Sequence, residues 1–163
     1  MTNTTFNMSA AYTGTPHHGF IVSFLQWYNR QNMKIVFTNN TMLNIQFSFY
    51  RPLLLDAYYS QITVNNNYWY HITSAVDVAL IHTIKNVTLN NNKFEIVSST
   101  SQNVMIIQGA SMATINGFNM SGADPVVVSS SILNLNLASG AEAYLSNIFF
   151  TGNIFSGTKA IVT

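Results

Sequence analysis

The sequence predicts an all-β solenoid, in which one chain winds into stacked coils of short parallel strands. Three observations predict this fold: a phrase that recurs six times, alternation of apolar residues within the phrase, and a charged-residue content of only 7%. Self-similarity at a period of about 20–50 residues is the sequence signature of repeat architectures. Few charges suit such a stack, because equivalent positions in adjacent coils lie side by side and like charges there repel.

Each copy of the phrase begins with an apolar residue and has a second apolar residue two positions later. The copies begin 29, 27, 25, 31 and 30 residues apart, at Phe6, Ile35, Ile62, Val87, Phe118 and Ile148. Apolar residues at alternate positions are typical of a strand that buries one face. We therefore expect a short strand at each of these places.

A tight bend is expected directly after each of these strands. The fourth residue of the phrase is always small and polar, and the next two are drawn almost wholly from Asn, Gly and Ala. Asn and Gly tolerate the left-handed backbone that other residues avoid. In five copies an apolar residue returns seven positions after the start, and a second strand is expected to begin there, at Met42, Trp69, Phe94, Pro125 and Phe155.

Asparagine is expected to form ladders at the bends. Equivalent residues of stacked coils lie about 4.8 Å apart, and side-chain amides at that spacing can hydrogen-bond along the stack. The repeat predicts two such columns, one of Asn40, Asn67 and Asn92 and one of Asn39, Asn66 and Asn91.

The order of apolar strand, Asn-containing bend and apolar strand resembles the right-handed parallel β-helix of the pectin-lyase-like superfamily. The resemblance covers nearly the whole chain and implies a single β-helix domain over residues 1–163, with about six coils of 25–31 residues. A β-sandwich or jelly roll is the alternative fold, since it also has short alternating strands and Asn or Gly turns. Antiparallel pairing of Ile62–Val64 with Val87–Leu89 would favour that alternative.

The two ends of the predicted solenoid carry no capping helix. The chain begins inside a repeat phrase and stops part-way round the sixth coil, at residues 159–163. Bare apolar ends of a solenoid aggregate or continue. We therefore expect a segment of a longer chain or of an assembly, with other protein subunits covering the solenoid ends.

Composition excludes several classes of function. The net charge is +1 and the basic residues are scattered, so no clustered surface for nucleic acid is expected. No apolar stretch approaches the roughly 18–20 residues of a transmembrane helix. Cysteine is absent, and His17–His18 has no third ligand at suitable spacing, so neither a metal nor a cofactor is expected.

The acidic residues do not predict a catalytic site. Enzymes of the resembling superfamily use carboxylates that converge on one face, and this chain has five acids in all. The repeat places Asp56 and Glu142 in one column three coils apart, which is about 14 Å. It also places Asp124 above Lys93, near Glu95, where a surface ion pair is the expected role.

Five Asn-x-Ser/Thr sequons suggest an extracellular or cell-surface location, at Asn3, Asn7, Asn39, Asn86 and Asn119. Asn7 and Asn119 hold the same place in the phrase, between two inward apolar residues, and are expected to face solvent. A chain rich in Asn and Thr also produces sequons by chance, and that explanation stays open.

Aromatic residues form the one predicted binding cluster, with Tyr58, Tyr59, Tyr68, Trp69 and Tyr70 in two successive coils. If Trp69 enters the core, strand alternation turns Tyr68 and Tyr70 outward. Flat amphipathic rings on a rigid surface suit sugar rings or a protein neighbour. Core packing and shielding of an edge are the alternative roles.

The sequence thus predicts a non-enzymatic structural module, a rigid scaffold that contacts neighbouring proteins or glycans. One alternative is a fragment of a polysaccharide lyase or glycoside hydrolase whose active site lies mostly outside this segment. Another is a receptor-binding spike in which the coil trimerises. An enzyme predicts a groove with two acids within about 10 Å of each other, whereas a scaffold predicts acids dispersed over unrelated turns.

Overall fold

The computed structural model describes residues 1–7, 22–26, 32–47, 51–74, 76–99, 103–122, 125–127, 131–152, 154–156 and 160–163. Every secondary-structure element in these ranges is a β-strand, and every pairing between strands is parallel. The described ranges contain no helix that is long and apolar enough to cross a membrane.

The strands form a rear sheet and a front sheet, with one small additional pair. The rear sheet contains β1 (Thr5–Asn7), β3 (Lys34–Thr38), β4 (Thr41–Phe47), β6 (Gln61–Asn65), β7 (Tyr68–Ser74), β9 (Asn86–Ser99), β11 (Met112–Ser121) and β14 (Glu142–Thr151). The front sheet contains β2 (Val22–Gln26), β5 (Leu53–Ala57), β8 (Ala79–His82), β10 (Met105–Gln108), β13 (Ser131–Asn136) and β16 (Ala160–Val162). The pair consists of β12 (Pro125–Val127) and β15 (Ile154–Ser156).

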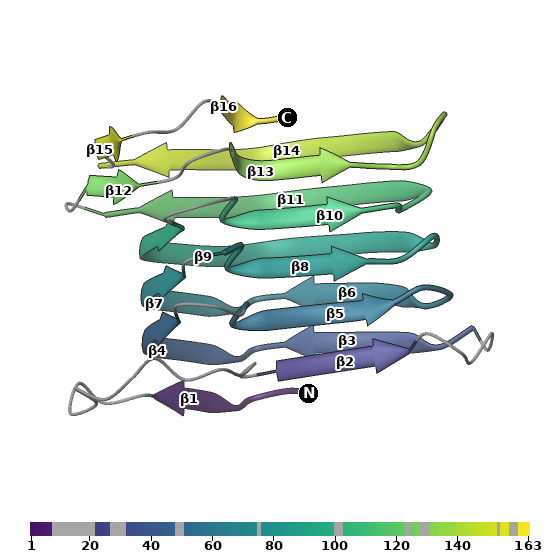
Figure 1. Ribbon diagram of the computed structural model, residues 1–163, viewed down its shortest axis with the longest axis horizontal. Helices are drawn as coiled ribbons and strands as arrows, with labels where there is room; N and C mark the ends of the chain where they lie inside the picture. The colour runs from purple at the N-terminus through teal and green to yellow at the C-terminus, as the bar shows by residue number, and fades with distance from the viewer. Residues whose placement is uncertain are drawn as a thin grey trace.

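The chain alternates between the two sheets and climbs one level with each circuit, which makes a parallel β-solenoid (Figure 1). Front strands run to the right and rear strands to the left while the chain rises from N-terminus to C-terminus, so the coil is right-handed. Ile62 pairs with Val87 and Val64 with Leu89 in parallel, which excludes the sandwich alternative. About four complete turns are formed, slightly fewer than the expected six, because the first and last of the six coil levels are incomplete in the described residues.

The register of the coils corrects the predicted alignment of the repeat. The copies at Ile35, Ile62 and Val87 are aligned as expected. Phe118, however, pairs with Asn92, and Ala113 takes the place opposite Val87. The strand after the bend also has apolar residues at alternate positions, so the phrase that begins at Phe118 is the post-bend strand of its coil.

The first coil is misaligned for the same reason, because Phe6 pairs with Met42 and not with Ile35. The last coil has the same register as the coil of Phe118, because Ile148 pairs directly with Phe118. The strands predicted at Pro125 and Phe155 are present, as β12 and β15, but their place in that column is wrong. Met120 and Phe150 hold it instead, in register with Phe94.

The bend of the rear sheet has a left-handed residue in every coil. Its positions have φ between 51° and 80°, and they are Asn3, Asn39, Asn66, Asn91, Gly117 and Asn147. Glycine is required in the fifth coil because a Cβ on Gly117 would lie 2.5 Å from the side-chain oxygen of Asn91. Asn and Gly reach this conformation at the least cost, so the predicted bend chemistry holds even where the predicted alignment fails.

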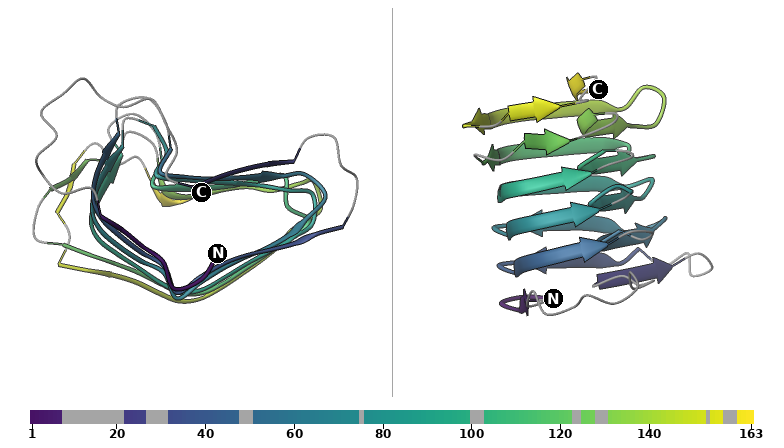
Figure 2. Two further views of the ribbon diagram at one scale, coloured as in Figure 1. Left: turned by 90° about the horizontal axis from the view of Figure 1, so that it is seen from below. Right: turned by 60° about the vertical axis from the view of Figure 1, so that its left-hand side comes forward.

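The core is a continuous apolar column inside the coil, and the outlines of successive coils superimpose when viewed along the axis (Figure 2). Its centre is a stack of aromatic rings, in which Trp69 lies 5.5 Å from Phe94 and Phe94 lies 4.7 Å from Phe118, measured between ring centroids. All three side chains are buried. Because each coil contributes one or two large side chains to this stack, neighbouring coils are held in one register.

Candidate functional site

The column of Asn40, Asn67 and Asn92 forms a buried amide ladder inside the bend. The Nδ2 of Asn40 donates to Oδ1 of Asn67 at 3.1 Å, and the Nδ2 of Asn67 donates to Oδ1 of Asn92 at 2.9 Å. Each of these residues is only 1% exposed. The ladder joins three successive coils without using a charge.

The same ladder also satisfies backbone groups at the bend. The backbone amide of Asn40 donates to Oδ1 of Asn67 at 2.9 Å, and Nδ2 of Asn67 donates to the Phe37 carbonyl at 3.0 Å. Asn92 repeats the second contact with the Val64 carbonyl at 2.7 Å. These residues therefore have a structural role, because every amide is occupied by the coils themselves.

The column of Asn39, Asn66 and Asn91 is different. All three are exposed, and their common feature is the left-handed backbone. Within the described residues, no side-chain hydrogen bond joins one of them to another. The prediction of a second ladder is therefore wrong. These residues are asparagines because asparagine adopts the left-handed conformation of the bend at low cost.

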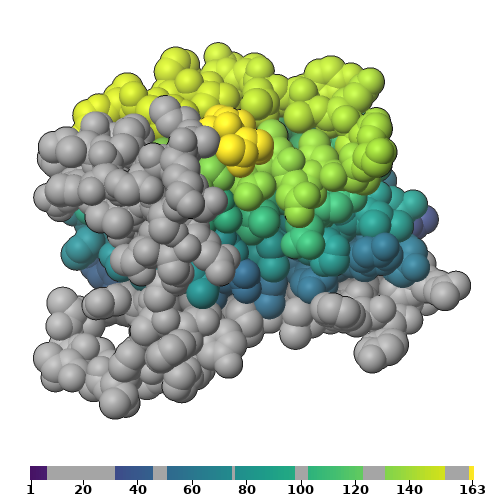
Figure 3. All heavy atoms as spheres, turned by 45° about the horizontal axis from the view of Figure 1, so that its top comes forward, coloured from purple at the N-terminus to yellow at the C-terminus, as the bar shows by residue number. Residues whose placement is uncertain are grey.

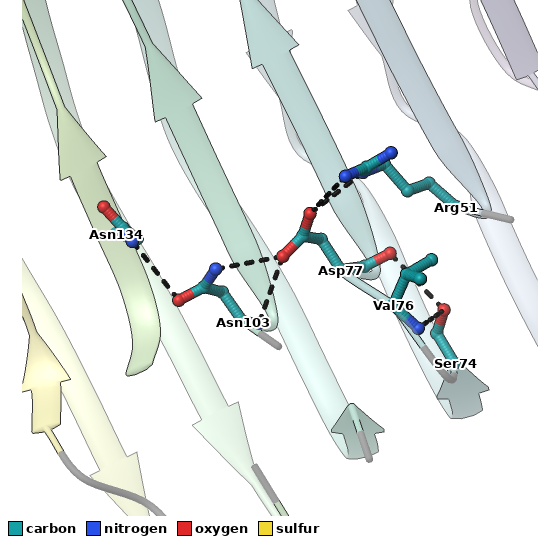
Figure 4. A network of polar contacts seen from close by, with 6 residues as sticks. All are labelled: Arg51, Ser74, Val76, Asp77, Asn103 and Asn134. Carbon is teal, nitrogen blue, oxygen red and sulfur yellow. Dashed lines mark hydrogen bonds and ion pairs between the residues drawn. The ribbon is translucent and has the colours of Figure 1, made fainter. Parts of the chain in front are cut away.

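A second buried polar column stands where the chain enters the front strands (Figure 4). Asp77 Oδ1 accepts hydrogen bonds from the backbone amide of Asn103 at 3.1 Å and from its Nδ2 at 2.9 Å. Asp77 Oδ2 pairs with the guanidinium of Arg51 at 2.8 Å. In the next coil Oδ1 of Asn103 accepts from the hydroxyl of Ser131 at 2.8 Å and from the amide of Asn134 at 3.4 Å.

The sequence prediction missed this column, although its members lie at equivalent places in four coils. Residues Arg51, Asp77, Asn103 and Ser131 differ in chemical type, so no repeated residue marks the position. The available signal is their constant distance of two residues before an inward apolar residue, which is seen only once the register of the front strands is known.

The front sheet carries an oriented carboxylate–imidazole pair. His82 Nδ1 lies 2.9 Å from Oδ1 of Asp56, which belongs to the coil below. The imidazole packs edge-on against Tyr58, with ring centroids 5.5 Å apart, and over Gly109, where a Cβ would lie 3.4 Å from the ring. These three contacts hold the ring in place between neighbouring coils.

The rear sheet has a second polar and aromatic cluster beyond the bend. Tyr68 donates a 2.9 Å hydrogen bond to Oε2 of Glu95, and Lys93 forms a 2.9 Å ion pair with the same oxygen. The ammonium of Lys93 also lies 5.1 Å from the centroid of the Tyr68 ring. Burial and the contact with Glu95 raise the pKa of Tyr68 to about 12. Hydrogen bonds from Lys93 and Tyr68 lower the pKa of Glu95.

The predicted aromatic cluster divides into two surfaces and a core residue. Trp69 is fully buried, which turns Tyr68 and Tyr70 outward, 6.2 Å apart between ring centroids. Tyr58 and Tyr59 lie instead in the turn after β5, at the opposite end of the coil from β7 (Figure 1). The five residues are therefore not one binding site.

The acidic residues lie in positions that differ from the repeat-based expectation. Asp56 pairs in register with His82 of the front sheet, whereas Glu142 begins β14 of the rear sheet, so the two do not share a column. The predicted alignment was wrong because it used the misplaced last repeat. Asp124 lies outside the described residues, as do His17 and His18. In the described part of the chain, no three His, Cys, Asp or Glu side chains gather closely enough to hold a metal ion.

The five sequons also differ from one another. Asn3 and Asn39 are exposed residues of the same bend column, and Asn86 is exposed on β9, where its Oδ1 accepts a hydrogen bond from Ser111. Asn119 lies between the inward Phe118 and Met120, as expected, but it is only half-exposed and its side-chain oxygen is buried.

Asn7 and Asn119 are not equivalent either. Asn7 pairs with Leu43, whereas Asn119 pairs with Lys93. The predicted equivalence used the phrase alignment that the register corrects, and the side chain of Asn7 lies outside the described part of the structure.

No protein-family model, curated protein or solved structure matches this chain, so its family is not established by similarity.

Proposed function

We propose that this protein is a non-enzymatic scaffold, a rigid β-solenoid that presents its outer facets to neighbouring proteins or glycans. The observation that carries the proposal is the use of its polar side chains: Asn67 and Asp77 are both buried and both join one coil to the next. Buried amides and carboxylates that are fully engaged with the chain stiffen the stack. They are not available to a substrate.

The four described acids support the scaffold over an enzyme fragment. Asp56 contacts His82, Asp77 contacts Arg51, Glu95 contacts Lys93, and Glu142 accepts a hydrogen bond from Tyr144. Each acid lies on a different element, and each has a partner on its own or an adjacent coil. A glycosidase or lyase needs two carboxyl groups that converge on one sugar ring.

The facet with Tyr68 and Tyr70 is the part of the surface best suited to contact a glycan. The two rings lie side by side on the rigid strand β7, next to the charged groups of Lys93 and Glu95. A flat ring beside hydrogen-bonding groups suits the apolar face and the hydroxyls of a sugar. The rings of Tyr58 and Tyr59 stand edge to face at 5.0 Å and do not form such a flat platform.

We further propose membership of the pectin-lyase-like superfamily and an extracellular or cell-surface location. The right-handed parallel coil and the Asn ladder at its bend support the first. The exposed sequon residues Asn3 and Asn39, on an outer corner of the coil, support the second.

Contact with other subunits at the solenoid end is part of the same proposal. Leu145 belongs to a core column but is 43% exposed on the outermost strand β14, and Phe149 on the same strand is 52% exposed. The residues around β14 form the upper rim of the molecule in the space-filling view (Figure 3). A partner subunit on this end would bury Leu145, and one that also reaches the outer face of β14 would bury Phe149.

The scaffold proposal is tested by incubating the protein with neutral and acidic polysaccharides and measuring new reducing ends and unsaturated uronate products. We expect no cleavage. Retention on immobilised glycans should fall for Tyr70→Ala and stay unchanged for Tyr58→Ala, which removes a more exposed ring at the other end of the coil. Cleavage that Glu95→Gln abolishes without lowering thermal stability would contradict the scaffold and favour the enzyme.

A further inference from the structure

The rear sheet has a flat, repetitive outer surface on the segment before the bend, which we name the Thr–Asn face. It consists of the outward residues of β3, β6, β11 and β14 and of the first part of β9. They form three columns of five: Lys34, Gln61, Asn86, Met112 and Glu142; Val36, Thr63, Thr88, Thr114 and Tyr144; and Thr38, Asn65, Asn90, Asn116 and Ser146. The residues between them point inward, as the burial of Ile62, Val64 and Ile115 shows.

The centre of the Thr–Asn face carries no charge over three successive coils. Thr63, Thr88 and Thr114 lie in register in its middle column, which places equivalent hydroxyl and methyl groups about 4.8 Å apart. Exposed strands usually carry charges, which prevent association of one sheet with another. An uncharged, flat and partly apolar facet lacks that protection.

The two ends of the face are complementary to each other. The first column has Lys34 at one end and Glu142 at the other, and both side chains are exposed. The middle column has Val36 at its β3 end and Tyr144 at its β14 end. The side chain of Tyr144 is 54% exposed. The hydroxyl of Tyr144 donates to the carboxylate of Glu142, which holds the acid at its end of the column.

One symmetry operation brings these ends together. A two-fold axis parallel to the strands, in the plane of contact and level with β9, reverses the order of the coils in the second copy and keeps each column facing its equivalent. Lys34 of one copy then faces Glu142 of the other, and Val36 faces Tyr144. Both pairs form twice, and Thr88 meets Thr88 near the axis.

We propose that the Thr–Asn face is a self-association surface, through which two copies of this chain form an antiparallel, two-fold symmetric dimer. A surface that is complementary to itself under a two-fold axis makes a closed dimer and does not propagate. Opposite charges at the two ends of one column select the antiparallel arrangement, because like charges across an interface are unfavourable. The inference stands independently of the proposed scaffold function and of any glycan contact.

The size of the face predicts a weak, concentration-dependent dimer. Five strands at about 4.8 Å, each about 3.3 Å per residue along its length, give a contact roughly 20 Å by 17 Å. This is small compared with stable interfaces, which bury about 800 Å² on each partner. We therefore expect dissociation in the micromolar range and weakening with salt, since the end contacts are ion pairs at a solvated rim.

A parallel arrangement of two copies lacks this complementarity. A two-fold axis along the solenoid places the first column against the third, so Lys34 faces Thr38 and the two lysines lie at the same level. Glu142 is then opposite Ser146. Neither charge has an opposite partner, and a parallel trimer has the same difficulty.

The test measures the molar mass by sedimentation equilibrium from low micromolar to several hundred micromolar protein. We expect a monomer–dimer equilibrium that Lys34→Glu weakens at least tenfold and that the double variant Lys34→Glu/Glu142→Lys restores. Thr88→Arg should weaken the dimer further, because it brings two like charges together near the axis. Lys93→Glu makes the same charge change on another facet and should leave the dimer unchanged.

Thermal unfolding of each variant establishes that the fold persists. A monomer at every concentration, a trimer, or a dimer that Lys34→Glu does not weaken would overturn the proposal. Failure of the double variant to restore association would also overturn it, because rescue by exchange of charges requires Lys34 and Glu142 to face each other. A glycan found on Asn86 of the natural protein would contradict it as well, since Asn86 lies at the centre of the first column.

Discussion

The two buried polar columns differ in the direction of the hydrogen bonds that join neighbouring coils. In the column at the rear bend, the amide of Asn40 in the lower coil donates to the side-chain oxygen of Asn67 in the upper coil. In the column at the start of the front strands, the amide of Asn103 in the upper coil donates to the carboxylate of Asp77 in the lower coil. The direction of hydrogen-bond donation determines which residue types can occupy each column.

Asn67 must donate and accept at once, because its Nδ2 contacts Phe37 and Asn92 while its Oδ1 receives two donors from Asn40. Only a carboxamide of this length does both, so the column repeats asparagine. Asp77 only accepts, from Asn103 above and from Arg51 below, so a carboxylate is suitable there. Repetition of one residue type is thus a consequence of hydrogen-bond direction and not of burial, since Asn67 and Asp77 are both 1% exposed.

The largest effect is expected from Asp77→Ala. The substitution leaves Arg51 without its ion-pair partner and leaves two donors of Asn103 unsatisfied in the interior. Each unsatisfied buried donor costs about 1–3 kcal/mol, and the lost ion pair with the 29%-exposed Arg51 adds less than a buried pair would. We therefore expect the free energy of unfolding to fall by about 3–5 kcal/mol. Urea unfolding followed by circular dichroism measures the change. Asp77→Asn keeps the acceptor for Asn103 and should cost less, about 1–2 kcal/mol, and equal losses for the two variants would contradict this role of the carboxylate.

A loss of about 2–3 kcal/mol is expected from Asn67→Ala, because a buried unsatisfied donor or acceptor costs about 1–3 kcal/mol. Asn67→Asp retains the acceptor for Asn40 but cannot donate to Phe37 or Asn92. It should therefore be no more stable than the alanine variant above pH 6. An aspartate variant as stable as the natural protein would remove the distinction between the two columns.

A smaller effect is expected at the exposed neighbour Asn66, whose φ is 54°. Asn66→Ala should lower the free energy of unfolding by about 1 kcal/mol, the ordinary cost of a left-handed residue with a Cβ. Asn66→Gly should have little effect, since glycine adopts this conformation freely. If alanine were tolerated as well as glycine, the bend would not depend on backbone conformation at this position.

The smallest effect is expected from Glu95 and depends on pH. Its pKa is lowered in the folded protein, so its stabilising contribution is present above the unfolded value of about 4.5 and is lost as the pH falls. Glu95→Gln should lower the free energy of unfolding slightly at pH 7, by less than about 1 kcal/mol for an ion pair so near solvent. The two proteins should become equally stable at pH 3. A difference that grows on acidification would contradict the sign.

Tyr68 gives the corresponding test in alkali. Its pKa is raised from 10.0 to about 12, so the contact with Glu95 contributes below pH 10 and is lost as the pH rises toward 12. Titration of tyrosine absorbance should show a late-ionising group that is absent from Tyr68→Phe. If the late-ionising group were still present in Tyr68→Phe, it would belong to another tyrosine.

The parts of the fold that could be predicted from the sequence are those where one residue type recurs. The parallel coil, the left-handed bend and the ladder at Asn40, Asn67 and Asn92 were predicted on that basis. The register after Leu89 was not, because Ala113 is too small to mark an apolar position, while Phe118 five residues later fits the same phrase. In that coil the amide column is also replaced by Phe118, which joins the aromatic stack.

The candidate surfaces were less predictable than the core. Tyr68 and Tyr70 were correctly placed outside once Trp69 was inside, since strand alternation determines this. Tyr58 could not be separated from them in the sequence, because only the closed path of the coil shows that the turn after β5 and strand β7 lie at opposite ends. The Asp56–His82 contact depends in the same way on the register of the front strands.

The register of the coils determines every column of side chains, and cysteine cross-linking tests that register because the chain contains no cysteine. The structure pairs Asn119 with Lys93, whereas the repeat phrase would pair it with Thr88. Directly opposed residues of parallel strands lie within the Cα separation of about 4.4–6.8 Å that a disulfide requires. In dilute, oxidised protein we expect an intramolecular disulfide in Lys93→Cys/Asn119→Cys, seen by mass as the loss of two hydrogen atoms, and none in Thr88→Cys/Asn119→Cys. The reverse result would contradict the register and, with it, the columns described above.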